Sequence, residues 1–128
     1  MINILFVDDE PGYQTAFQRL MARRKDACVR CSASGEEALA ILESFAADIV
    51  ITDVTMPGMN GFNLLKMIKI RHPLTFVVVI TGFGTVDQAV EAMKLGACDY
   101  LVKPFDPDGV RRVLDRLIAH RDLLSRNL

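Results

Sequence analysis

The sequence predicts an α/β fold, a five-stranded parallel sheet in the order 2-1-3-4-5 with helices on both faces. Two observations support the α/β class, and the strand order is taken from a common doubly wound arrangement. Five short apolar runs alternate with five amphipathic segments, and only short loops join them. In addition, the runs at residues 2–7, 47–53 and 76–80 are apolar at most positions. Such continuous runs are typical of strands that are buried on both faces.

Length and composition are those of one globular domain, residues 1–128. Of these residues 51% are apolar and 24% are charged, and no apolar stretch approaches the ~18 residues of a membrane span. The segment Met1-Ile2-Asn3 leads directly into a strand, so we expect no signal peptide and a cytoplasmic protein. A net charge of −1 creates no global field for nucleic acid.

The first strand, Ile2–Val7, ends at Asp8-Asp9-Glu10, and a helix follows from Pro11. Proline suits the first turn of a helix, and acids there interact favourably with its dipole. The spacing of five apolar residues predicts one buried face on this helix: Tyr13, Ala16, Phe17, Leu20 and Met21.

Residues 27–33 mix polar and apolar side chains, as expected of an edge strand. Ser34 or Gly35 is the expected cap of the second helix. Its apolar positions are Ala38, Leu39, Leu42 and Phe45. The third strand, 47–53, ends at Asp53, and a loop with Pro57, Gly58 and Gly61 follows.

The second half of the chain repeats the strand–helix alternation. The third helix follows Gly61, carries Leu64, Leu65 and Ile68 inward, and ends before Pro73. Strand 76–80 ends at Thr81, and strand 100–102 ends at Lys103-Pro104. Apolar residues at helical spacing mark the fourth helix (Val86, Ala89, Val90 and Met93) and the last one (Val110, Val113, Leu114, Leu117 and Leu124).

Polar residues stand where four of the five strands end. In the order 2-1-3-4-5 these strands are neighbours about 4.8 Å apart, so Asp8, Asp9, Asp53, Thr81 and Lys103 share one edge of the sheet. Three nearby carboxylates repel one another unless a cation is present, and an open oxygen-rich site suits Mg²⁺. Together with a lysine, such a site can stabilise phosphoryl transfer to a carboxylate. Asp53 is the candidate nucleophile because it is central.

Four motifs resemble those of response-regulator receiver domains of bacterial two-component signalling, which have a flavodoxin-like fold. They are Phe6-Val7-Asp8-Asp9-Glu10-Pro11, Asp53 with Met56-Pro57-Gly58-Met59-Asn60-Gly61, Thr81-Gly82, and Lys103-Pro104-Phe105. They occur in the order of that family, and the resemblance covers the whole chain.

The resemblance implies a role for each residue. Asp53 would take a phosphoryl group from a histidine kinase or a phosphotransfer protein. Asp9, Asp53 and the carbonyl of Thr55 would bind Mg²⁺, and Asp8 would assist through water. Thr81 and Lys103 would contact the phosphoryl oxygens. The Lys103-Pro104 peptide would be cis, for which proline lowers the energetic cost.

The resemblance also implies a switch between two states. The Thr81 hydroxyl would move toward the phosphoryl group, and Tyr100 would turn inward. The fourth helix, fifth strand and fifth helix would then expose a face that binds an output domain or a second copy. The stretch 81–105 looks most like receivers attached to transcription activators or to sensor-kinase relays. Phe83 would shield the acyl phosphate from water.

Each candidate residue also has an ordinary explanation when it is taken alone. Asp8-Asp9-Glu10 could only cap a helix, Thr81 could only favour a strand, and Lys103 could be a solvated charge. These explanations account poorly for all the residues together. Cys28 and Cys31 lie within one strand on opposite faces, and with Cys98 they make an odd number, so we expect reduced structural thiols.

Two other functions have sequence requirements that differ from those of a receiver domain. The alternative is a small phosphohydrolase or phosphotransferase with an aspartyl-phosphate intermediate. Such an enzyme generally needs an acid shortly after the nucleophile, where Thr55 stands, and a substrate cap. A flavodoxin-like electron carrier is excluded, because no polar Gly/Ser/Thr loop for binding phosphate follows the first strand. The last helix has a basic side, but Asp108, Asp115 and Asp122 dilute it, so we expect no direct nucleic-acid binding.

Overall fold

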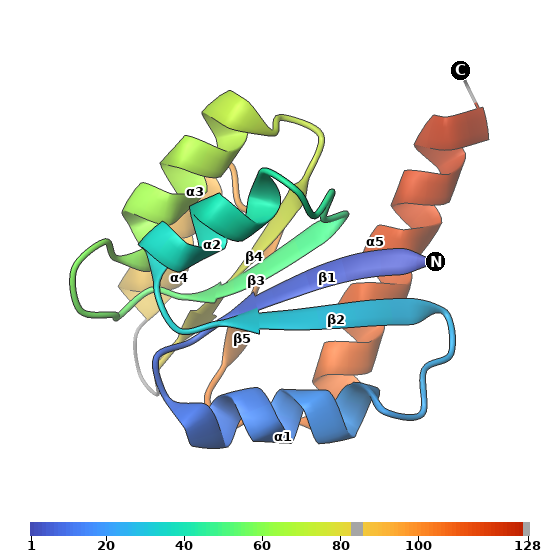
Figure 1. Cartoon of the computed structure of the whole chain (residues 1–128), viewed down its shortest axis with the longest axis horizontal. Coiled ribbons are helices and arrows are strands. Elements are labelled where there is room, and N and C mark those ends of the chain that lie inside the picture. Colours follow the sequence, from blue (N-terminus) through green and yellow to red (C-terminus); the bar gives the residue numbers. More distant parts are fainter. Residues whose placement is uncertain (83–85, 127–128) are drawn as a thin grey trace.

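The computed structural model describes residues 1–82 and 86–126. Its centre is one parallel sheet in the order β2-β1-β3-β4-β5, as the sequence predicts. The strands are β1 (Ile2–Val7), β2 (Ala27–Ser32), β3 (Ile49–Asp53), β4 (Phe76–Thr81) and β5 (Asp99–Val102). The helices are α1 (Pro11–Met21), α2 (Gly35–Leu42), α3 (Gly61–Arg71), α4 (Val86–Lys94) and α5 (Pro107–Arg126) (Figure 1).

The helices form a layer on each face of the sheet (Figure 1). Helices α1 and α5 cover one face, and α2, α3 and α4 cover the other. The direction of the strand order reverses at β1, since β2 lies on one side of it and β3 on the other. Right-handed crossovers that run in opposite directions place their helices on opposite faces. In open α/β sheets, ligands bind outside the carboxyl ends of the strands at such a reversal, which here lies between β1 and β3.

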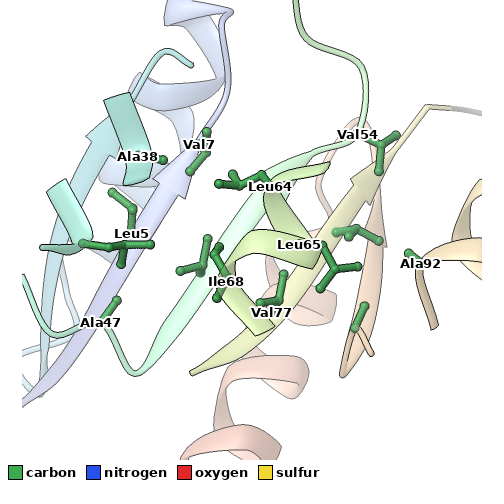
Figure 2. Packing of buried hydrophobic residues seen from close by; sticks show 14 of the residues in the cluster. Leu5, Val7, Ala38, Ala47, Val54, Leu64, Leu65, Ile68, Val77 and Ala92 are labelled. Carbon is green, nitrogen blue, oxygen red and sulfur yellow. The ribbon is translucent and has the colours of Figure 1, made fainter. Parts of the chain in front are cut away.

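Helix α3 supplies much of the core on the face that α2, α3 and α4 cover (Figure 2). Leu64, Leu65 and Ile68 are fully buried there against strand residues such as Leu5 and Val77. These three residues lie on one side of the helix, because Ile68 follows Leu64 by four positions and Leu65 by three. Asn60 caps the helix, as its side chain accepts a hydrogen bond from the Asn63 amide at 2.9 Å.

Aromatic rings organise the core on the opposite face. Phe6 of β1 stacks on Phe17 of α1 with ring centroids 4.4 Å apart, and both are fully buried. Phe105, which precedes α5, packs edge-on against Phe6 at 5.8 Å. Helix α5 adds Leu114 and Leu117, each at most 2% exposed. The start of α5 is thereby fixed against β1 and α1.

Some apolar residues lie outside the core, contrary to their position in the expected helix faces. Ala16 is exposed because α1 and α5 leave a cavity of about 740 Å³ between them. Leu124 is 49% exposed, since α5 extends beyond the sheet at that end (Figure 1). On α4 only two alanines are buried, while Val90 and Met93 are nearly half exposed.

The three cysteines are free thiols, as the odd count suggests. Cys28 and Cys31 both lie in β2. Within the described part of the chain, no helix has both the length and the apolar composition needed to cross a bilayer.

Candidate functional site

The ends of four adjacent strands bring the predicted residues to one edge of the sheet. In the strand register Val7 pairs with Thr52, Asp53 with Ile80, and Thr81 with Val102. Asp8 and Asp9 follow β1 directly, Asp53 ends β3, and Lys103 follows β5. Because parallel strands in this register end at nearly the same level, residues far apart in the chain become neighbours.

Lys103 connects the carboxylates at this edge. Its Nζ lies 2.8 Å from Asp53 Oδ2, 2.9 Å from Asp8 Oδ2 and 3.2 Å from Glu10 Oε1. The side chains of Lys103, Asp53 and Asp8 are 12%, 7% and 0% exposed, so the two shorter ion pairs are largely shielded from water. Interactions between such buried charges are much stronger than those of a surface salt bridge.

Burial and charge act in opposite directions at this site. Burial is the main cause that raises the pKa of Asp8, and the Glu10 amide and the Lys103 ammonium oppose it only in part. Burial also disfavours the charged form of Lys103, but the carboxylates of Asp53 and Asp8 outweigh this and raise the pKa of Lys103. The site therefore holds a charged lysine beside a carboxylate that is costly to ionise.

The loop between β3 and α3 is held close to Asp53. The Thr55 amide donates a hydrogen bond to Asp53 Oδ1 at 3.0 Å. At the far end of the loop, the Gly61 amide donates to the Val54 carbonyl at 3.1 Å. A Cβ atom at Gly61 would lie 2.2 Å from the Asp53 carbonyl oxygen, so only glycine fits there. The Met59 amide donates to Glu36 Oε1 of α2 at 3.0 Å, which ties the middle of the loop to a neighbouring helix.

The donor set at this edge fits a hard divalent cation. Asp8, Asp9, Glu10 and Asp53 each offer a carboxylate oxygen, and these oxygens lie within 4.8 Å of one another. Among the described residues, Asp8 Oδ2 is buried and accepts no hydrogen bond of good geometry, although Lys103 lies near it. Asp9 is partly exposed. A buried oxygen without a directed donor, beside open carboxylates, suits Mg²⁺ that keeps some water ligands.

Thr81 and Tyr100 are the residues to which the resemblance gives a switching role. Thr81 is buried, and its hydroxyl donates to the Leu101 carbonyl of β5 at 3.5 Å. Tyr100 is 46% exposed. The Lys103–Pro104 peptide bond is cis. Phe83, expected to shield the site, lies outside the described residues.

Residues 4–115 match the family model of the response regulator receiver domain. The chain belongs to this family. The match covers most of β1, all of the other strands, and the acidic and basic residues at the strand ends.

Curated relatives of this receiver domain are longer regulators. The DNA-binding transcriptional regulator NtrC of Salmonella typhimurium is 40% identical over 114 residues, which are 89% of this chain and 24% of the relative. The transcriptional regulatory protein ZraR of the same organism is 40% identical over 119 residues, 93% of this chain and 27% of the relative. The chain thus spans about a quarter of the length of these relatives.

Solved structures support the same fold. A receiver domain protein from Clostridium thermocellum superposes with a TM-score of 0.89 at 32% identity, covering 97% of this chain and 99% of that one. NtrX from Brucella abortus superposes with a TM-score of 0.90 at 31% identity, covering 98% of this chain and 29% of that one.

The sequence prediction did not assign two residues to the site of the receiver domain. The sequence indicates Glu10 only as part of the acidic motif, yet its carboxylate reaches Lys103. The sequence predicts Tyr13 only on the buried face of α1, yet the Lys103 Nζ lies 4.1 Å from the centroid of its ring. The signal for Glu10 was its place beside Asp8-Asp9. No signal in the sequence indicated that Tyr13 would face a lysine ninety positions away.

Proposed function

We propose that Asp53 is the phosphoacceptor of this receiver domain and that a histidine kinase or a phosphotransfer protein is the donor. A carboxylate oxygen of Asp53 attacks phosphorus, the bond between phosphorus and the histidine nitrogen breaks, and an acyl phosphate forms. The observation that carries this proposal is the position of Lys103, whose Nζ lies within 2.9 Å of both Asp8 and Asp53. Lys103 can transfer its interaction from Asp53 to a phosphoryl oxygen without moving far.

Asp8, Asp9, Asp53 and the Thr55 carbonyl are the proposed holders of Mg²⁺. When bound, the ion supplies positive charge that offsets the charge of the carboxylates and of the transferred group. The Thr55 amide keeps one Asp53 oxygen oriented through its 3.0 Å hydrogen bond. Because burial makes the negative charge of Asp8 costly, binding of a cation beside it is favoured.

Thr81 and Tyr100 are the proposed switch. In the state described above the Thr81 hydroxyl donates to β5 and Tyr100 is half exposed. A phosphoryl group on Asp53 offers the hydroxyl a charged acceptor, and charge-assisted hydrogen bonds are roughly twice as strong as neutral ones. Movement of Thr81 would leave space for the Tyr100 ring, so the group shifts the balance between two states.

The fourth helix, fifth strand and fifth helix are the proposed output surface. Several of its apolar side chains are exposed: Val86, Val90, Met93, Tyr100 and Val102. The names of the relatives indicate regulators of transcription, so we propose a transcriptional output through an attached domain or a second copy. We do not propose direct nucleic-acid binding, since Arg111, Arg116 and Arg121 of α5 pair with carboxylates.

Residues 1–128 are proposed to form one receiver domain. Helix α5 continues past the family match, and its Arg121 still pairs with Asp48 at 3.4 Å.

We regard the protein as a regulator that phosphorylates and dephosphorylates itself rather than as a turnover enzyme. Its cytoplasmic location stays a prediction.

The decisive experiment is incubation with acetyl phosphate and Mg²⁺, followed by intact-protein mass spectrometry. We expect one phosphate, stable in acid and labile in base, on the wild type and on the control variant Asp122→Asn. Asp53→Asn should gain none, and EDTA should prevent the reaction. Phosphate on Asp53→Asn would overturn the assignment, and rapid repeated hydrolysis of p-nitrophenyl phosphate would favour the phosphohydrolase.

A further inference from the structure

Lys103 contacts an aromatic ring as well as acids. Its Nζ lies 4.1 Å from the centroid of the Tyr13 ring, well inside the range of a cation–π interaction. Asp53, Asp8 and Glu10 are its acidic neighbours. The side chain of Lys103 is only 12% exposed, so little water competes for the ammonium.

The Tyr13 ring is itself held by the aromatic core. Phe105 packs edge-on against Tyr13 with centroids 5.5 Å apart and an angle of 78° between the rings. Phe105 in turn packs edge-on against Phe6 at 5.8 Å and Phe17 at 6.5 Å. The position of Tyr13 is therefore set by contacts that begin in β1 and α1 and end at the lysine.

We propose that Tyr13 is a positioning residue for Lys103 in phosphoryl transfer; this inference rests on the function proposed above. A lysine ammonium on a flexible four-carbon stem can adopt many rotamers, and each carboxylate attracts it in a different direction. The face of an aromatic ring attracts the ammonium and limits where it can go. Tyr13 thus keeps Nζ near Asp53 Oδ2, where the phosphoryl oxygens will be.

The ring face, and neither the hydroxyl nor the bulk of Tyr13, is the part that acts in this proposal. Tyr13→Phe keeps the ring and removes the hydroxyl, so it should behave as the wild type. Tyr13→Leu keeps an apolar side chain and removes the ring. Tyr13 is only partly buried, so neither change should prevent folding.

A matched control is a cation–π contact that involves the outer strand β2. There the guanidinium of Arg30 lies 5.3 Å from the centroid of the Phe45 ring. Phe45→Leu removes a cation–π contact of the same kind without touching Lys103. It should leave the phosphorylation rate unchanged.

The first measurement needs no phosphate. In NMR spectra of protein with ¹³C-labelled lysine, the ring current of Tyr13 should shift the ε-methylene protons of Lys103. This shift should persist in Tyr13→Phe and Phe45→Leu and disappear in Tyr13→Leu. A signal that does not change in Tyr13→Leu would overturn the contact itself.

The second measurement is the rate of Asp53 phosphorylation by acetyl phosphate at saturating Mg²⁺. We expect Tyr13→Leu to be about fivefold slower and Tyr13→Phe to match the wild type. Equal rates for all variants, with the NMR shift lost, would overturn the positioning role while leaving the phosphoacceptor role intact. Absence of phosphorylation in the wild type would instead overturn the proposed function.

Discussion

Replacing Lys103 by methionine removes the positive charge between two buried carboxylates while keeping an unbranched side chain of similar length. Lys103 Nζ lies 2.8 Å from Asp53 and 2.9 Å from Asp8, and none of the three side chains is more than 12% exposed. Breaking a buried ion pair by removing one partner typically costs 3–5 kcal/mol. We expect about 3 kcal/mol, at the low end, because the raised pKa of Asp8 lets that carboxyl take up a proton and relieve part of the repulsion.

The assay is urea unfolding at pH 7, followed by circular dichroism, in EDTA and again in excess Mg²⁺. In EDTA Lys103→Met should be less stable than the wild type by the amount given above. In Mg²⁺ the difference should shrink, since a cation bound to the same carboxylates stabilises the folded state by mass action. Lys66→Met is the control, because Lys66 is exposed on α3 and forms no ion pair among the described residues.

A double variant tests the physical cause. Asp8→Asn removes one of the two charges that Lys103 neutralises, so Asp8→Asn combined with Lys103→Met should be more stable than Lys103→Met alone. If Lys103→Met is as stable as Lys66→Met in EDTA, Lys103 does not balance the two acids and the electrostatic reasoning fails. If Mg²⁺ does not reduce the loss, the carboxylates do not form a common cation site.

Three further predictions follow from contacts near the site. Gly61→Ala places a Cβ 2.2 Å from the Asp53 carbonyl oxygen and should lower the free energy of unfolding in urea by about 3 kcal/mol. Gly12→Ala is the control, because its Cβ meets nothing within 4 Å and should not destabilise the protein. If the two variants were equally stable, the close approach at Gly61 would be contradicted. Glu36→Ala removes the acceptor of the Met59 amide and should cost about 1 kcal/mol and speed hydrogen exchange at that amide, while Glu37→Ala, on the same helical turn, should leave the exchange unchanged. Asp8→Asn should be more stable than the wild type in EDTA at neutral pH, because burial raises the folded-state pKa of Asp8 above 3.8 and its ionised form is costly. The free-energy cost of ionising Asp8 in the folded state is absent below its unfolded-state pKa and grows as pH rises through its folded-state pKa. The stability gained by Asp8→Asn in thermal unfolding should therefore vanish near pH 3. A stability gain that did not change with pH would exclude this cause.

The alternation of strands and helices and the residues that end the strands could be predicted because both depend on local patterns. The strand order is not local, and it was predicted from a common doubly wound arrangement. Continuous apolar runs distinguish buried strands, and the turn residues after Asp53 mark the end of β3. Once five parallel strands are ordered, the position of Asp8, Asp53 and Lys103 at one edge follows from geometry. The family motifs in the sequence led to the same residues.

Contacts that depend on side-chain direction could not be predicted. The apolar spacing of α4 indicated a helix, but it did not indicate that Val90 and Met93 would remain nearly half exposed while the two alanines pack inward. The spacing of α1 placed Tyr13 on an apolar face without showing that its ring meets Lys103. Helical periodicity defines which residues share a face, but packing decides how that face is rotated.

The sequence by itself determined the alternation of strands and helices, the acidic and basic residues that end the strands, and the membership of the receiver family. These depend on residue type and on short-range spacing. Only the tertiary structure decided that Lys103 contacts Asp8, Glu10 and Asp53 at once, that Gly61 lies against the Asp53 carbonyl, and that an aromatic ring contacts the lysine. These contacts join segments up to 95 residues apart, and their distances are set by the packing of two helical layers on one sheet.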